Sequence, residues 1–282
     1  MNSGLSSREF LMMRKFIEEQ CGIAIHEDKA YLIESRLSKL LIDFGLVSFD
    51  DLYNRVSCGN DPEVIEKVID AITTNETLWF RDSTPWSVLE DILIPGYING
   101  LREGRKSRIR IWSAACSTGQ EPYSIAMCID NYLARNGIDD INLSHFEILA
   151  TDISRTVLEI AGAGRYDNIS IMRGLSGEYK DRYFRNEGRV WVLSEKIRNA
   201  VSFRQFNLQK DFSLFGSLDL VFCRYVMIYF SDDLRREVLN KTARVLGKDG
   251  VLLIGSSELI SGYEDKFFME QHKNGVFYRL KG

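Results

Sequence analysis

The feature that most constrains the fold is an alternation of short apolar runs and amphipathic helical stretches, which begins near residue 108. Helical patterns such as EPYSIAMCIDNYLARNG separate the apolar runs. Alternation of this kind predicts an α/β fold with a doubly wound, mostly parallel sheet that is covered by helices on both faces. The predicted strands are RIRIW (108–112), FEILATD (146–152), VSFRQF (201–206), LDLVFC (218–223) and GVLLIGS (250–256).

Residues 165–200 interrupt this alternation. A short helix is predicted from Ser176 to Phe184, and GRVWVL follows Asn186-Glu187-Gly188 as a strand candidate. A β-branched run directly after turn residues is typical of a strand. The sequence therefore predicts a small antiparallel insertion in the α/β domain at about 165–200.

The first 74 residues have a pattern typical of short amphipathic helices that form a small all-α bundle. Three of the helices begin with a side chain that can accept the free N–H groups of a first turn, or with a proline at the first helical position. Their start signals are the capping box Ser6–Glu9, the pair Ser48 and Asp51, and the dipeptide Asp61-Pro62, and the second helix is expected from about Asp28 to Phe44. We therefore expect a helical domain at 1–74, a connecting segment at 75–107 and the α/β domain at 108–282.

Composition argues against several classes of protein. The 282-residue chain has a formal net charge of −4 and a pI of about 5.6, so it lacks the basic footprint of a nucleic-acid-binding protein. No apolar run approaches the ~18 residues of a membrane span, and the N-terminus lacks a signal-peptide pattern. Five scattered cysteines and three histidines show no metal-ligand spacing. We expect a cytoplasmic protein without a metal site, and nothing requires more than a monomer.

Polar side chains follow four of the predicted strands, at the edge where ligands bind in a doubly wound sheet. In strand order they are Glu121, Asp152, Asn207 with Leu208, and Arg224 with Tyr225. An acidic residue after the second strand can accept hydrogen bonds from ribose hydroxyls, although a helix N-cap or a turn residue would also explain Asp152 and Asn207. Because neither GxGxxG nor a P-loop is present, the pattern favours a nucleoside cofactor without a pyrophosphate, such as S-adenosylmethionine.

Four stretches together carry a family resemblance. TTNETLWFR (73–81), CSTGQEPYS (116–124), the strand end at Asp152 and CRYVMIYF (223–230) closely resemble the CheR family of chemotaxis receptor methyltransferases. The resemblance covers essentially the whole chain and implies a Rossmann-like methyltransferase domain. It also implies methyl transfer from S-adenosylmethionine to glutamate side chains of membrane chemoreceptors, which yields glutamyl methyl esters and S-adenosylhomocysteine.

The resemblance also implies the site residues. Arg81 is the candidate for orienting a carboxylate, either the cofactor's own or the substrate's, because a guanidinium fork suits both. Tyr229 is expected to donate a hydrogen bond at the reaction centre, although from the residues alone a core aromatic would explain it equally. Trp79 and Phe80 are expected to be packing anchors. The expected cofactor contacts are Asn75, Thr77, Arg81, Glu121, Asp152, Asn207, Leu208, Cys223, Arg224 and Tyr225.

Three positions depart from the family pattern. Gln120 stands where the family usually has a glutamate, Trp79 where phenylalanine is common, and Tyr225 where the motif CRNVMIYF has asparagine. A phenol cannot reproduce the paired donor and acceptor of an amide. These departures leave open a non-catalytic regulator that binds S-adenosylmethionine, and a methyltransferase of a non-motility pathway is a further alternative.

Two expectations concern the receptor. Lys29, Arg36 and Lys39 lie on the polar side of the second helix, so this face is expected to steer the cytoplasmic domains of methyl-accepting receptors. A solvated helix face would explain the same charges. The connection FRNEGRV (184–190) is short, whereas family members that grip a receptor tail peptide carry a longer, glycine-richer loop there. We therefore expect no tail-peptide tether.

Overall fold

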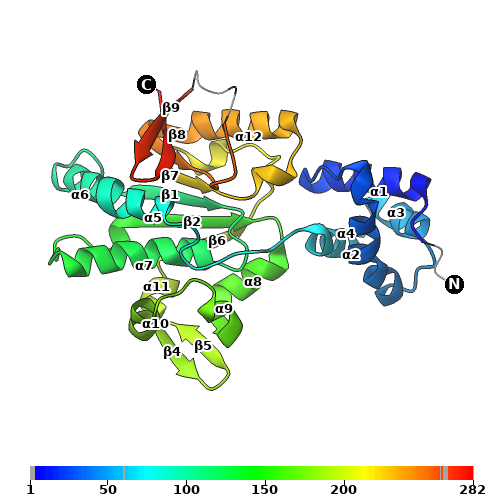
Figure 1. The fold of residues 1–282 in the computed structure, drawn as a ribbon, viewed down its shortest axis with the longest axis horizontal. Helices are drawn as coiled ribbons and strands as arrows, with labels where there is room; N and C mark the ends of the chain where they lie inside the picture. Colours follow the sequence, from blue (N-terminus) through cyan, green and yellow to red (C-terminus); the bar gives the residue numbers. More distant parts are fainter. Residues whose placement is uncertain (1–3, 60, 261, 263–265, 282) are drawn as a thin grey trace.

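The computed structural model describes residues 4–59, 61–260, 262 and 266–281, and it places a helical bundle at one end of an α/β domain (Figure 1). The predicted all-α bundle is confirmed. Its elements are α1 (Ser7–Cys21), a 3₁₀ turn η1 (Glu27–Lys29), α2 (Ala30–Asp43), α3 (Phe49–Ser57) and α4 (Pro62–Ile72).

The predicted start signals at Ser6, Ser48 and Asp61 are the observed N-caps. The second helix, expected from about Asp28, differs: Asp28 lies within η1, and α2 begins at Ala30 without a side-chain cap. Ser6 Oγ accepts the Glu9 N–H at 3.3 Å, and a Glu9 carboxylate oxygen accepts the Ser6 N–H at 2.9 Å. Ser48 and Asp51 form the same reciprocal pair at α3, and the Asp61 side chain caps α4. These boundaries depend on hydrogen bonds within one helical turn, which is why the sequence alone locates them.

The α/β domain is built on a seven-stranded sheet with the order β6-β2-β1-β7-β8-β10-β9. The first five strands in this order run parallel, and β10 is antiparallel to both its neighbours. The strand order reverses between β1 and β7, so the predicted doubly wound, mostly parallel sheet is confirmed. The strands are β1 (Ile109–Ala114), β2 (Phe146–Asp152), β6 (Val201–Gln205), β7 (Leu218–Cys223), β8 (Leu246–Leu253), β9 (Phe267–His272) and β10 (Gly275–Leu280).

Two features of this sheet differ from the expectation. β8 begins at Leu246 rather than at residue 250, because a polar stretch that was expected to precede the strand lies within it. Asp249 in this stretch has a φ of 65°, and the pairing of β8 with β7 is irregular between Leu218 and Leu220. The hairpin β9–β10 was not predicted. Most side chains of β9 are at least partly exposed, so the strand lacks the apolar run that marks β1 or β7.

Helices cover both faces of the sheet, with α12 on one side and α7 and α8 on the other (Figure 1). Residues 84–102 of the connecting segment are helical, and their apolar side chains join the main core cluster. Among the described helices, none is long and apolar enough to cross a membrane. The remaining elements are α5 (Thr84–Val88), a π-helical turn η2 (Leu89–Leu93), α6 (Ile94–Arg102), α7 (Gln120–Arg135), η3 (Leu143–His145), α8 (Arg155–Ala163), η4 (Ser213–Phe215), η5 (Met227–Tyr229) and α12 (Asp232–Val245).

The insertion is a three-stranded antiparallel sheet with the order β3-β5-β4, as predicted, on the side of the domain away from α12 (Figure 1). Gly188, at φ 76°, forms the tight turn between its last two strands. Its elements are β3 (Arg165–Asp167), α9 (Asn168–Met172), α10 (Gly177–Tyr183), β4 (Phe184–Glu187), β5 (Val190–Leu193) and α11 (Glu195–Arg198).

Trp79 anchors the non-helical stretch 73–83 to this insertion. The indole is 1% exposed and meets the rings of Tyr166 and Phe184 edge-on, at centroid distances of 5.0 and 5.3 Å. Its Nε1–H donates to the Ser170 carbonyl at 3.0 Å. Gly174 has a φ of 99°, and a Cβ there would lie 2.2 Å from the Trp79 carbonyl oxygen. The predicted role of Trp79 as a packing anchor is confirmed.

Candidate cofactor-binding site

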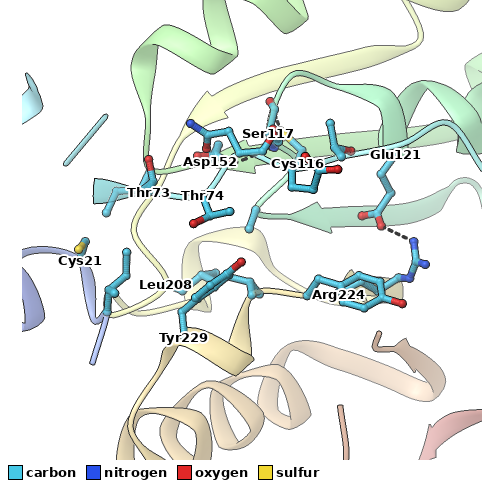
Figure 2. Close-up of a pocket in the computed structure, with 18 of the residues that line it drawn as sticks. Cys21, Thr73, Thr74, Cys116, Ser117, Glu121, Asp152, Leu208, Arg224 and Tyr229 are labelled. Carbon is cyan, nitrogen blue, oxygen red and sulfur yellow. Dashed lines mark hydrogen bonds and ion pairs between the residues drawn. The ribbon is translucent and has the colours of Figure 1, made fainter. Parts of the chain in front are cut away.

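One cavity lies where the bundle, the stretch 73–81 and the carboxyl ends of the strands meet. It encloses about 940 Å³, counting the part that opens to solvent, which is within the size range of small-molecule sites. In Figure 2, Asp152, Ser117, Thr73 and Thr74 lie on one side of it and Leu208, Tyr229 and Arg224 on the other, while Cys21 of α1 lies at the bundle end. The cavity is therefore placed where a doubly wound sheet binds ligands.

Ten of the eleven predicted site residues line this cavity although they come from distant parts of the chain. The exception is Cys223, whose side chain is 2% exposed and belongs to a hydrophobic core cluster instead. Burial raises the pKa of its thiol well above the ordinary value. The ten that line the cavity are Asn75, Thr77, Arg81, Glu121, Asp152, Asn207, Leu208, Arg224, Tyr225 and Tyr229.

Asp152, the last residue of β2, organises the loop that follows β1. Its carboxylate accepts the backbone N–H of Ser117 at 2.8 Å and that of Ser154 at 3.0 Å. Burial raises the pKa of Asp152, while these hydrogen bonds act in the opposite direction. A carboxylate has about four lone-pair positions, so two remain for hydroxyl donors such as those of a ribose. The Asp152 carboxylate is thus both a loop organiser and an available acceptor.

Asn207 lines the cavity but uses its amide mainly within the protein. Its Nδ2–H₂ donates to the carbonyl of Gln20 in α1 at 2.8 Å and to Gln209 Oε1 at 3.1 Å, and its Oδ1 accepts the Gln209 N–H at 2.9 Å. Lys241 of α12 donates to the carbonyls of Leu208 and Gln209. The loop of Asn207 and Leu208, which was predicted to contact the cofactor, is therefore fixed by both the bundle and α12.

Arg224 is held by two carboxylates. Its side chain is 1% exposed and donates to Glu121 and to Asp82, each at 2.8 Å, and to the Arg81 carbonyl at 2.6 Å. Glu121 also accepts the Ser113 hydroxyl at 2.8 Å. Because a buried charge is stable only when it is paired, this network ties the start of α7 to the end of β7 and to the stretch 73–83.

Arg81 and Tyr225 lie against each other. The Arg81 guanidinium carbon is 3.5 Å from the centre of the Tyr225 ring. The Tyr225 hydroxyl contacts Asp82 and, at 2.8 Å, Ser256. Arg81 itself donates one long hydrogen bond of 3.4 Å to the Glu76 carbonyl. Of the two guanidinium groups in the cavity wall, that of Arg81 is only partly buried and makes no other hydrogen bond to a described residue, whereas the Arg224 group is fully buried and only its enclosed Nε lacks a partner there.

Tyr229 presents its side chain to the cavity. Among the described residues its hydroxyl has no hydrogen-bond partner, so the alternative of a core aromatic with a bonded hydroxyl does not describe it. Its carbonyl accepts the Ala24 N–H at 2.8 Å, and Ile23 pairs with Phe230 as an isolated bridge. The bundle thus holds the backbone of Tyr229 in place while the phenol remains available.

Several residues of the site were not foreseen. Cys21 and Ile23 line the cavity, although helix-end signals gave no indication that the end of α1 faces the sheet. Glu258, in the loop after β8, is 7% exposed and accepts the N–H groups of Tyr225 and Gly255 at 2.7 and 2.8 Å. Its position after a buried strand was the one signal that could have identified it, because the ends of four other strands also contribute polar residues to the site.

The donor set of the cavity fits S-adenosylmethionine. Asp152 offers acceptors for ribose hydroxyls, Leu208 and Phe206 offer apolar surface for a base, and Arg81 offers donors for a carboxylate. The carboxylates in the wall favour a cationic sulfonium and ammonium. Among the described residues there is no group of three or more histidine, cysteine or acidic side chains that could hold a metal ion.

Comparisons with known proteins agree with this geometry. Residues 8–73 match the all-alpha domain of the CheR methyltransferase family, and residues 75–276 match its SAM-binding domain. A chemotaxis protein methyltransferase of Pseudomonas putida is 42% identical over 275 residues, which cover 97% of this chain and 98% of the relative. That of Vibrio parahaemolyticus is 43% identical over 280 residues, 98% of each chain. That of Borreliella burgdorferi is 36% identical over 264 residues, 93% of this chain and 92% of the relative.

The matched SAM-binding domain supports the expected cofactor, S-adenosylmethionine, and the two matched domains span nearly the whole described chain. The cavity lies where these two domains meet. The chain belongs to the CheR family of S-adenosylmethionine-dependent chemotaxis methyltransferases.

Proposed function

We propose that this enzyme methylates glutamate side chains in the cytoplasmic domains of chemoreceptors and forms glutamyl methyl esters. The observation that carries the proposal is the cavity itself. Within it, the available guanidinium of Arg81 and the available phenol of Tyr229 accompany the acceptor Asp152. The relatives named above act in chemotaxis, and receptor cytoplasmic domains require an enzyme in the cytoplasm.

The chemistry needs little from the protein beyond binding and orientation. A solvent-exposed glutamate side chain has a pKa of about 4.3, so near pH 7 the acceptor is already a carboxylate and needs no general base. When bound, S-adenosylmethionine supplies an activated methyl group on a sulfonium. The task left to the side chains is to hold the carboxylate oxygen in line and to exclude water.

We assign the roles as follows. Asp152 accepts ribose hydroxyls, and Leu208 covers the base. Arg81 binds a carboxylate, and Tyr229 donates a hydrogen bond at the reacting oxygen. The further proposed contacts, made through side chain or backbone, are Asn75, Thr77, Glu121, Asn207, Arg224 and Tyr225.

A methyl-transfer assay tests the proposal. The full chain, radiolabelled S-adenosylmethionine and receptor cytoplasmic fragments from the same organism should give labelled fragments. Glutamyl methyl esters are cleaved by mild base and release volatile methanol, so the label should become volatile after alkaline treatment, and mass spectrometry should place the added mass on glutamates. Cofactor binding by calorimetry without any labelled fragment would identify a non-catalytic regulator instead. Base-stable label would identify another acceptor.

For the receptor surface, we propose that Lys29 and Lys39 of the bundle meet acidic receptor helices. Both side chains are exposed, and neither forms an ion pair with a described residue. Arg36 is different, because its guanidinium donates to the Ile72 and Thr73 carbonyls and to the Thr74 hydroxyl. Its charge is engaged at the end of α4, so the steering role that was expected of Arg36 passes to the two lysines.

We further propose that no receptor tail peptide is required. A peptide that extends the insertion would have to pair with an edge strand. One such edge, β4, has only four residues, and Arg185, Asn186 and Glu187 are exposed on it, which are features that discourage strand addition. Calorimetry with the C-terminal peptides of the organism's receptors tests this. Micromolar binding that is lost in Val190→Ala or Val192→Ala variants would contradict it.

A further inference from the structure

The contact between Arg81 and Tyr225 is closer than the other cation–ring contacts among the described residues. Its 3.5 Å from guanidinium carbon to ring centre compares with 4.9 Å or more in the other pairs. Both residues are partly buried in the cavity wall. A guanidinium stacked on an aromatic face loses rotational freedom but keeps its in-plane N–H groups available to a ligand.

Tyr225 is itself held on three sides. Its backbone has a φ of 58°, a conformation that is uncommon for a bulky residue. The Glu258 carboxylate accepts its N–H at 2.7 Å, and its hydroxyl contacts Asp82 and Ser256. Gly255 lies against the ring, because a Cβ at that position would be 2.9 Å from it. The ring is therefore a fixed platform rather than a mobile side chain.

The other cation of the cavity wall has no comparable freedom. Arg224 directs one terminal nitrogen to Glu121 and the other to Asp82 and the Arg81 carbonyl. Asp82 therefore joins both systems, since the same oxygen accepts from Arg224 and from the Tyr225 hydroxyl. An incoming carboxylate would meet its available guanidinium at Arg81.

We infer that Tyr225 is a positioning residue that orients Arg81 to bind a carboxylate in the cavity. The carboxylate-binding role of Arg81 rests on the proposed function, and the carboxylate is either the amino-acid group of the cofactor or the acceptor glutamate. Asparagine at this position would relax the backbone, because it enters positive φ readily, but it would provide no ring to stack on. In this chain the phenol takes the place of a small amide and gives Arg81 a fixed orientation.

A double-mutant cycle in the full chain tests the inference. Tyr225→Asn removes the ring and keeps a residue suited to the backbone, whereas Tyr225→Phe keeps the ring and removes only the hydroxyl. Each variant is made with Arg81 intact, with Arg81→Ala for binding measurements and with Arg81→Lys for turnover. Calorimetry measures the affinity for S-adenosylhomocysteine and for methylthioadenosine, which lacks the amino-acid carboxylate. Steady-state kinetics with a receptor fragment give kcat and KM.

With Arg81 intact, we expect Tyr225→Asn to lower either the affinity for S-adenosylhomocysteine or kcat/KM for the receptor fragment by about ten-fold. Tyr225→Phe should lower the same quantity less, because the stack persists. In the Arg81 variants the Tyr225→Asn effect should shrink to about two-fold or less, since residues that act through one another are not additive. Weaker S-adenosylhomocysteine binding with unchanged methylthioadenosine binding identifies the cofactor's carboxylate. A lower kcat or higher KM with unchanged cofactor affinity identifies the acceptor's.

Two results would overturn the inference. Equal losses with and without Arg81 would show that Tyr225 acts independently, and wild-type behaviour of Tyr225→Asn would show that the ring is not needed. The binding arm requires no methyl acceptor, so its outcome is separate from whether glutamate is the substrate.

Discussion

Single residues in the cavity wall, and two that flank Arg81 beside it, adopt backbone conformations that are uncommon for their type. Phe80, Asp82, Ala115, Ser117 and Tyr225 have φ values between 47° and 61°. Such conformations cost about 1–3 kcal/mol each and persist where surrounding contacts impose them. Here the contacts come from polar groups of the site, as when Ser117 donates its N–H to the carboxylate of the second strand. The unusual backbone and the binding groups therefore depend on each other.

Replacement of Asp152 by asparagine should weaken cofactor binding. The change removes a charged acceptor, and a hydrogen bond to a charged group contributes about 1.5–3 kcal/mol, so the affinity for S-adenosylhomocysteine should fall about ten-fold or more. Calorimetry measures the loss. Asp167→Asn is the matched control, because Asp167 caps α9 outside the cavity and asparagine is an equally good cap. Wild-type affinity in Asp152→Asn would refute the ribose assignment.

The raised pKa of Asp152 predicts opposite effects of pH on binding and stability. Because the folded pKa lies above the unfolded one, Asp152 contributes stability at low pH that is lost as the pH rises through the folded pKa. Cofactor affinity should instead fall as acidification through that raised pKa protonates the carboxylate. Calorimetry and urea unfolding between pH 7 and about pH 4 should show both trends relative to Asp152→Asn. Parallel profiles in the two proteins would contradict this.

Tyr229→Phe should separate catalysis from binding. The hydroxyl has no partner among the described residues, so its removal should leave unfolding and S-adenosylhomocysteine affinity nearly unchanged. If it donates a hydrogen bond in the transition state, kcat should fall about ten-fold or more, as when one such donor is removed from other active sites. An unchanged rate constant for methyl transfer in a single-turnover experiment would show that Tyr229 takes no part in the mechanism.

At the scale of elements, the stretch 73–83 is attached at its start and near its middle to different parts of the protein. Trp79 holds it to the insertion, and Arg36 of α2 holds its start at the end of α4. The C-terminal carbonyls of a helix are good acceptors for a guanidinium. Since residues 73–78 and Arg81 line the cavity, these attachments set the shape of one wall.

Arg36→Met should therefore affect a cavity that Arg36 does not line. The loss of its hydrogen bonds should lower the free energy of unfolding by about 2 kcal/mol and weaken S-adenosylhomocysteine binding several-fold. Lys39→Met on the exposed side of the same helix is the matched control and should change neither quantity. Urea unfolding and calorimetry measure both, and similar behaviour of the two variants would show that Arg36 does not support the stretch 73–83.

At the scale of the whole molecule, the cofactor cavity belongs to both the bundle and the α/β domain. Asp70 of α4 accepts the hydroxyls of Ser154 at 2.5 Å and Thr156 at 2.6 Å, at the start of α8. Asn207 and Gln209 satisfy carbonyls at the end of α1. The bundle is thereby fixed against the strand ends, so a receptor bound to it as we propose would lie near the cavity.

Charge reversal of Lys29 and Lys39 together should raise KM for receptor fragments without changing cofactor affinity. Exposed charges steer association, so the increase should be several-fold at low salt and should diminish as added salt screens the field. Lys248→Glu, an exposed lysine of β8 in the α/β domain, is the matched control. An unchanged KM at low salt, or an equal rise in Lys248→Glu, would show that the bundle lysines do not meet the receptor.

Local chemistry made much of this protein predictable from its sequence. Caps such as Ser48 with Asp51, the buried runs of β1 and β7, and the polar residues after the strands depend on neighbours within a few positions. The strand ends of a parallel sheet meet at one edge, so Asp152 and Arg224 could be assigned to one site in advance.

Only the tertiary structure decided which polar groups are already occupied. Arg36 is engaged by the stretch 73–74, Asn207 bonds Gln20 across 187 positions of the chain, and Glu258 supports Tyr225. The contribution of Cys21 and Ile23 to the cavity likewise depends on how the bundle docks. Such pairings follow from which surfaces meet after folding, and neither periodicity nor capping carries that information, because both describe interactions within a single element.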